Sequence, residues 1–241
     1  MKHMTGESYP ASILSQQLLV GVAEELKLPL LQIARQLELA QLNGSANLAT
    51  VQATAQTALQ LLDNYVLGVR LALEPQHFPL EAVSVSSVLY DASQQLDAFA
   101  KSYGVSLELN IAGKYGPVLA NKQGLQAALV SVGAALIEAI PALEGTQQLK
   151  LHLATHRSRY GIIAGVYADT KKLSNEALQR GRRLQGRSRQ PLLNLSQSNG
   201  AGIFVADAIL HAMDLHLMAS RHHRLHGLGT VMQSNHQLQL V

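Results

Sequence analysis

Two long apolar seams joined by a short turn constrain the fold of this chain most. Apolar residues recur at steps of three and four, first as Leu19, Val22, Leu26, Leu30, Ile33, Leu37 and Ala40, then as Leu48, Val51, Ala55, Ala58, Leu62, Tyr65 and Val69. This spacing is typical of helices that pack along one face. Asn43-Gly44-Ser45 lies between them and predicts a tight turn. We therefore expect an antiparallel helical hairpin over residues 1–74.

Such a hairpin buries its seams fully only against a second hairpin. The sequence therefore predicts a homodimer held by a four-helix bundle. The other interpretation is two ordinary amphipathic helices in the core of a monomer, and the spacing alone does not choose between the two. Glu74-Pro75-Gln76 has the composition of a linker and marks the predicted end of this first domain.

The rest of the chain, residues 76–241, has mixed periodicity and predicts a second domain of α+β class. Helices are expected at residues 86–103, 121–140 and 202–213, and strands at 78–83, 105–111, 147–155, 160–168, 215–221 and 230–234. This order predicts a two-layer sandwich, with helices over one face of a largely antiparallel sheet.

Composition narrows the class of protein. The chain has 241 residues, of which 47% are hydrophobic and none is cysteine, so disulfides and metal–thiolate sites are excluded. No apolar run approaches the ~20 residues that span a bilayer, and no signal-peptide pattern opens the chain. We therefore expect a cytoplasmic chain without a membrane segment. The net charge of +3 is mild, and no nucleic-acid partner is expected.

Residues 24–30 read Glu-Glu-Leu-Lys-Leu-Pro-Leu. This stretch resembles the phosphoacceptor box of two-component sensor histidine kinases, roughly His-Glu-Leu-Arg-x-Pro-Leu. Glu25 falls on the family's acidic position, but Glu24 stands where the family has its phosphorylated histidine. A carboxylate cannot form a stable phosphoramidate, so the resemblance implies a kinase relative that has lost autophosphorylation. Glu24 instead carries a fixed negative charge, as phosphohistidine would.

The order of elements after residue 76 resembles the ATP-binding domain that histidine kinases share with gyrase B. One family box is a helix that supplies asparagines to Mg²⁺ and the phosphates, and here Ser131 and Ala135 occupy those positions. Alanine offers no ligand atom and a serine hydroxyl is a weak one, which argues against bound Mg²⁺. Glu138 offers a carboxylate one turn further on. The other interpretation is an ordinary exposed helix glutamate.

Two further boxes are partly kept. Asp169 and Thr170 follow a predicted strand where the family's aspartate binds the adenine amino group, although both glycines of that box are missing. An ordinary helix-capping turn is the other interpretation. Gly200 and Gly202 resemble the glycine-rich box that opens a helix beneath the phosphates, where backbone N–H groups suit an anion. The resemblance thus implies ATP or ADP as the ligand.

Basic residues gather between these two boxes. Seven of the 19 Lys and Arg lie in residues 171–189, with Arg187 among them and Glu176 as the only acid. Such a segment suits phosphate contact, an acidic partner surface or a solvated loop. A second basic stretch holds His222, His223 and His226. Adjacent histidines on a strand point to opposite faces, so we predict a solvated hairpin there and no metal site.

Three functional hypotheses remain. The favoured one is a histidine-kinase-like signalling protein without autophosphorylation, which dimerises, binds nucleotide and docks the receiver domain of a response regulator beside Glu24. The second is a divergent active histidine kinase or ATPase that uses Asp169, Gly200, Gly202 and the basic segment. The third is an interaction scaffold that binds no nucleotide.

Overall fold

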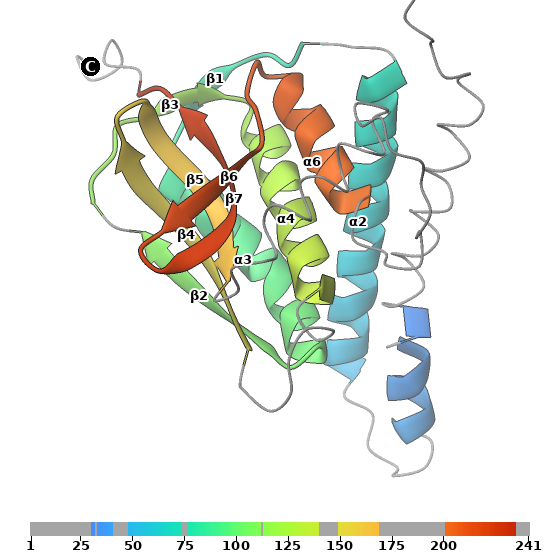
Figure 1. Cartoon of the computed structure of the whole chain (residues 1–241). Coiled ribbons are helices and arrows are strands. Elements are labelled where there is room, and N and C mark those ends of the chain that lie inside the picture. Colours follow the sequence, from blue (N-terminus) through green and yellow to red (C-terminus); the bar gives the residue numbers. More distant parts are fainter. Residues whose placement is uncertain are drawn as a thin grey trace, which may run out of the picture.

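The computed structural model describes residues 30–31, 33–40, 48–73, 77–111, 113–139, 149–168 and 201–234. It confirms the predicted α+β class. Four helices lie on one side of a five-stranded sheet, and their axes run side by side (Figure 1). None of the helices in these ranges is long and apolar enough to cross a membrane.

Helices alternate with strands along much of the described chain. The helices are α2 (Leu48–Leu73), α3 (Val85–Ser102), α4 (Lys122–Ala139) and α6 (Ala201–His211), and residues 30, 31 and 33–40 are also helical. The strands are β1 (Glu81–Val83), β2 (Val105–Ile111), β3 (Val118–Ala120), β4 (Leu149–Ser158), β5 (Gly161–Ala168), β6 (Met218–His222) and β7 (Leu225–Met232).

The main sheet has the strand order β2-β4-β5-β7-β6. Only β2 and β4 run parallel, and the other neighbours are antiparallel. β1 and β3 form a separate antiparallel pair. The inward residues of the sheet, such as Leu151, Leu153 and Val166, share one hydrophobic core with the helices. The outward residues of β4 and β5 include His152, His156 and Tyr167, by alternation along each strand.

Short-range chemistry explains where the helices begin and end. The Ser84 side chain accepts a hydrogen bond from the Ser87 N–H and caps α3, and Gly104, with φ of 70°, allows the chain to leave that helix. The Asn121 side chain accepts from the Gly124 N–H at 2.9 Å and caps α4. These two helices therefore lie within one residue of their predicted bounds.

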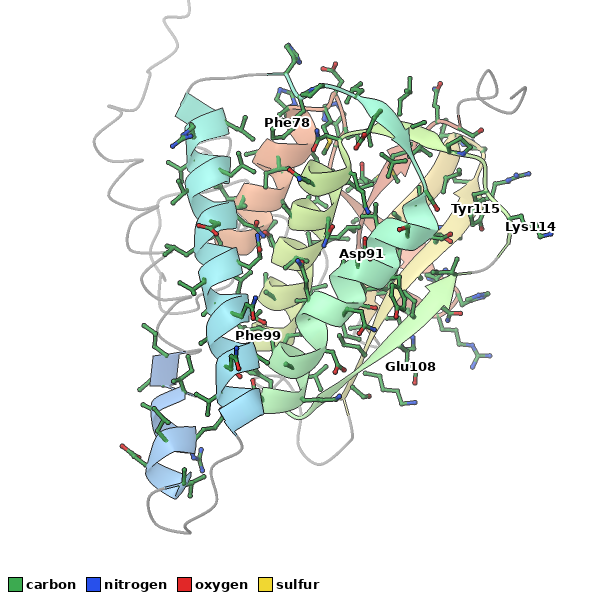
Figure 2. All side chains as sticks on the ribbon, turned by 180° about the vertical axis from the view of Figure 1, so that it is seen from behind. Phe78, Asp91, Phe99, Glu108, Lys114 and Tyr115 are labelled. Carbon is green, nitrogen blue, oxygen red and sulfur yellow. The ribbon has the colours of Figure 1, made fainter. Side chains whose placement is uncertain are left out.

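Small residues let the helices approach closely. A Cβ added at Gly68 of α2 would lie 2.9 Å from the Val205 Cα of α6, which is too close for any real side chain. A Cβ at Gly133 of α4 would overlap the Leu96 side chain of α3. The Ala- and Gly-rich sequence of α4 thus permits a tight layer, which Figure 2 shows from behind.

α2 does not turn its whole seam away from the rest of the molecule. Leu61 and Tyr65 are buried in the core that α3, α4 and α6 share, whereas Leu62 is 36% exposed. The predicted second seam is therefore divided, because Tyr65 and Ala58 face inward and Leu62 faces outward. The predicted domain boundary near residue 75 stays a prediction.

Two strands differ from the prediction. β3 was not predicted at all, since its three residues are too short to show alternation. β7 begins at Leu225, five residues before the predicted start, because Gly227 and Gly229 are strand residues. A Cβ at Gly227 would overlap the Val166 carbonyl oxygen of β5, so glycine here permits close backbone approach.

Candidate functional site

The resemblance places a nucleotide between α4, the end of β5 and the start of α6. Of the predicted site residues, the structure describes Ser131 on α4 and Gly202 in the first turn of α6. These two helices are packed against each other (Figure 1). Glu24, Glu25, Asp169, Thr170, Gly200 and Arg187 lie outside the described residues. Their roles stay predictions.

The Ser131 side chain faces α2. It is fully buried, donates a hydrogen bond to the Ala127 carbonyl oxygen at 2.8 Å and accepts one from the Asn64 Nδ2 at 3.3 Å. The Asn64 Nδ2 also lies within hydrogen-bond distance, 3.3 Å, of the Ala127 carbonyl oxygen. A metal or phosphate contact at Ser131 would therefore require the contact between α2 and α4 to open.

The sequence reasoning missed Asn64. This side chain is 2% exposed, and its Oδ1 accepts from the Gln60 Nε2 at 3.2 Å. Gln60, Asn64 and Ser131 thus form a polar chain inside an otherwise apolar contact. The available signal was two carboxamides four residues apart, between the apolar positions of the second seam, since this spacing places them on one helix face.

The other residues at this part of α4 are also buried. Ala135, at the second asparagine position, is 2% exposed and belongs to the hydrophobic core. Every residue of α6 from Ala201 to Leu210 is buried, so the helix is covered on all sides. At the two positions that resemble the Mg²⁺-binding asparagines, the structure has a methyl group and a hydroxyl that already has two hydrogen-bond partners. These residues do not fit a magnesium ion.

Glu138 is not the exposed helix glutamate that one interpretation predicted. It is 8% exposed, and its Oε2 has no hydrogen-bond partner among the described residues. Burial raises the pKa of Glu138 to about 8, so the carboxyl group is largely protonated at neutral pH. Burial, and then the charge of Glu138, also raises the pKa of Tyr103. A protonated carboxyl is a poor ligand for a hard cation.

Among the described residues, no group of three or more histidines, aspartates and glutamates could hold a metal ion.

The predicted solvated histidine hairpin was wrong for His222. This residue ends β6, is 3% exposed and contacts three other rings. His223 follows in the turn, is exposed and has φ of 53°. The turn between β6 and β7 and much of β6 are solvated, but the bend of the sheet brings His222 over β4 and β5. Strand order alone could not indicate this.

Comparison with known proteins bears on the fold. No protein-family model and no curated protein sequence matches the chain. Solved structures do match. Full-length ShkA in complex with AMPPNP has a TM-score of 0.51 at 14% identity, over 94% of this chain and 47% of that one.

Two further histidine kinases match with lower scores. Acinetobacter baumannii histidine kinase AdeS has a TM-score of 0.48 at 13% identity and covers 88% of this chain and 98% of its own. The cytoplasmic segment of histidine kinase QseC has a TM-score of 0.46 at 8% identity. The match covers 76% of this chain and 95% of the QseC segment. The match to ShkA, the one of these three with a TM-score above 0.5, shows that the chain shares the fold of that histidine kinase over the matched part.

Proposed function

We propose that this chain is a histidine-kinase-like signal-transduction protein of the two-component type that does not phosphorylate itself. The observation that carries the proposal is the state of α4. In a histidine-kinase fold, the two positions that resemble the asparagine ligands are the core residue Ala135 and the buried Ser131, whose hydroxyl already has two partners. The sequence change to Glu24 removes the phosphoacceptor independently of this loss.

Dimerisation through the helical hairpin is part of the proposal. It is supported by the outer side of α2, where Leu59, Leu62 and Val66 are 63%, 36% and 52% exposed. Spacings of three and four put these side chains on one face. Water-exposed leucines in a row are typical of a surface that another protein covers. A second copy of the chain fits because its α2 offers the same face. The receiver domain of a response regulator would then dock beside Glu24.

The proposal includes nucleotide binding but no metal-dependent catalysis. Gly202, in the buried first turn of α6, lies where the resemblance would place a phosphate beside backbone N–H groups, so binding there would require this turn to exchange its present contacts. Asp169, Thr170, Gly200 and Arg187 would supply adenine and phosphate contacts around it. ATP or ADP would act as a ligand that changes the conformation of the protein, and it would not donate a phosphate group.

Calorimetric titration of the purified chain with ATP, with and without Mg²⁺, tests this proposal. We expect micromolar binding that Mg²⁺ does not strengthen, and no phosphate release. Restoring the acceptor with Glu24→His should not restore phosphotransfer. Labelled phosphate on that variant would show that the ATP site is active and would overturn the proposal.

A nucleotide-free scaffold is the second candidate, and the contact between Asn64 and Ser131 favours it. This contact closes α2 over α4 at a position where the resemblance expects a ligand. Absence of binding at millimolar ATP, together with an intact dimer, would select the scaffold over the nucleotide-binding protein.

A further inference from the structure

Four aromatic rings meet on the side of the sheet that the helices do not cover. The His222 ring centroid lies 5.2 Å from that of His156, 5.5 Å from that of Tyr167 and 4.4 Å from that of His223. His156 and Tyr167 are 6.0 Å apart. We call His156, Tyr167, His222 and His223 the ring cluster. It joins β4 to the end of β6, although β5 and β7 separate these strands in the sheet.

The bend of the sheet makes this contact. The β6–β7 hairpin lies across β4 and β5 (Figure 1). Tyr167 is paired with Gly227 of β7, and Gly227 is paired with Ser220 of β6. Because Gly227 has no side chain, the Tyr167 ring reaches across it, and its hydroxyl lies 3.1 Å from the Ser220 Oγ. The backbone pairing of β7 with β5 holds the hairpin in the sheet, and the ring cluster and this hydrogen bond attach its edge strand, β6, to the outer face.

The cluster contains polar atoms without partners. The His156 Nδ1 and the His222 Nε2 are buried and have no hydrogen-bond partner among the described residues. A neutral imidazole tolerates this better than an imidazolium, whose two N–H groups and charge both need compensation. The ring cluster is therefore suited to neutral histidines.

The groups around the cluster supply little negative charge. From β2, the Glu108 side chain faces this side. Its Oε1 lies 2.5 Å from the Lys150 Nζ, and its Oε2 lies 3.4 Å from the His152 Nδ1. Figure 2 labels Glu108 on this edge strand. β4 contributes Lys150 and His152 themselves, by alternation with His156.

The remaining neighbours are neutral or basic. β5 contributes Tyr167, β6 contributes Ser220, and the turn contributes His223 and Arg224. The outward positions of β7, at Leu225, Gly227 and Gly229, do not titrate. Arg221 and His226 are opposite each other in the register of β6 and β7, and by alternation they lie on the other face of the hairpin. Protonated rings in the cluster would therefore repel one another, and the part of the chain that the structure describes places no free carboxylate beside them.

We propose that the ring cluster is an acid-sensitive clasp, which holds β6, the edge strand of the β6–β7 hairpin, over the outer face while His156 and His222 are neutral and releases it as they gain protons. Burial lowers the pKa of His222, and the neighbouring His223, His156 and His152 lower it further. Burial and then His223 lower the pKa of His156. The released hairpin binds more protons than the closed one below about pH 6.5, so acid favours release.

Release would reach the neighbouring strand. Ala168, the last residue of β5, pairs with His226 near the start of β7. Asp169 follows directly in the sequence. Release of β6 would thus disturb the strand that leads into Asp169, and with it adenine binding. This effect on adenine binding rests on the proposed function, whereas the opening of the hairpin does not.

Amide hydrogen exchange of the chain without nucleotide, at about pH 7.5 and about pH 5, tests the clasp. After correction for intrinsic rates, we expect amides of β6 and the paired part of β7 to lose about tenfold or more of their protection at the lower pH. The paired amides of β2 and β4 should keep theirs. Equal loss in all strands would mean global unfolding and would overturn the proposal, as would equal protection of β6 at both pH values.

His222→Phe is the decisive variant, since it keeps an aromatic ring that cannot be protonated. Its β6 protection should vary much less with pH than that of the parent chain. His77→Gln, at an exposed histidine away from the cluster, is the matched control and should behave like the parent. If His222→Phe does not fold, titration of the parent chain by NMR decides. His156 and His222 resonances that titrate at the ordinary histidine value would contradict the clasp.

Discussion

The Asn64 Nδ2 on α2 donates a hydrogen bond to the Ser131 Oγ on α4, at 3.3 Å and out of contact with water. The bond joins the predicted hairpin region to the helix that resembles the metal-binding box. It therefore links α2 directly to α4 through a polar contact inside the helical layer. Any shift of α2 along α4 must break it or replace it.

Replacing Asn64 with alanine should lower the free energy of unfolding by about 1–3 kcal/mol, because Ser131 loses one partner in a buried contact. Urea unfolding measures the change. In a double-mutant cycle with Ser131→Ala, the two losses should couple by about 0.5–1.5 kcal/mol. Gln52→Ala, at an exposed position of the same helix, serves as the control and should change stability little. Purely additive losses would show that the bond contributes nothing of its own.

Gly68→Ala should destabilise the chain although alanine is the better helix former by about 1 kcal/mol. The added methyl group would lie 2.9 Å from the Val205 Cα and force α2 away from α6. We expect a net loss of about 1–3 kcal/mol in urea unfolding. Asp63→Ala, at an exposed position of α2, is the matched comparison and should be neutral or stabilising. A stabilised Gly68→Ala variant would mean that the two helices do not touch there.

Periodicity predicted the elements that are determined by interactions between residues close together in the sequence. α3 and α4 lie where their apolar spacing and their caps at Ser84 and Asn121 indicate. The α+β class and the mostly antiparallel sheet followed from the order of the elements. The glycines of β7 misled the prediction, because glycine favours a turn when read alone and permits close strand contact only in the presence of β5.

The environment of single side chains could not be predicted, since it depends on contacts between distant segments. Ser131 was expected to face a ligand and instead faces Asn64, 67 positions away in the chain. His222 was expected in solvent, but the bend of the sheet brings it to His156. One of the two interpretations of Glu138 was an exposed helix residue, whereas the packing of the helical layer buries it.

The exposed row on α2 gives a test of dimerisation. The double variant Leu59→Glu and Leu62→Glu should turn a dimer into a monomer in analytical ultracentrifugation, because paired copies would bring four carboxylates together in an apolar contact. Its monomer fold should be retained, since both side chains face outward. Tyr90→Glu makes a similar change at a 53% exposed residue of α3 and should leave the dimer intact. A double variant that remains dimeric would place the dimer contact elsewhere.

Glu138→Gln should remove a pH dependence of stability that the parent chain has. The folded pKa of about 8 lies above the ordinary value of 4.5, so between these values the folded chain holds a proton that the unfolded chain has released. The free energy of unfolding of the parent therefore falls as the pH rises through this window and levels off above about pH 8. Glutamine has the same shape and no charge, so its variant avoids the fall.

Urea unfolding at about pH 5, 7 and 9 measures this difference. The gain of Glu138→Gln over the parent should be smallest at the lowest pH and reach about 2–4 kcal/mol at the highest, since each pKa unit corresponds to about 1.4 kcal/mol. Asp63→Asn, which removes an exposed carboxylate from α2, should follow the parent at all three pH values. A Glu138→Gln variant that also follows the parent would show that residue 138 is ionised and solvated at neutral pH. The carboxylate would then again be available to a cation at the end of α4.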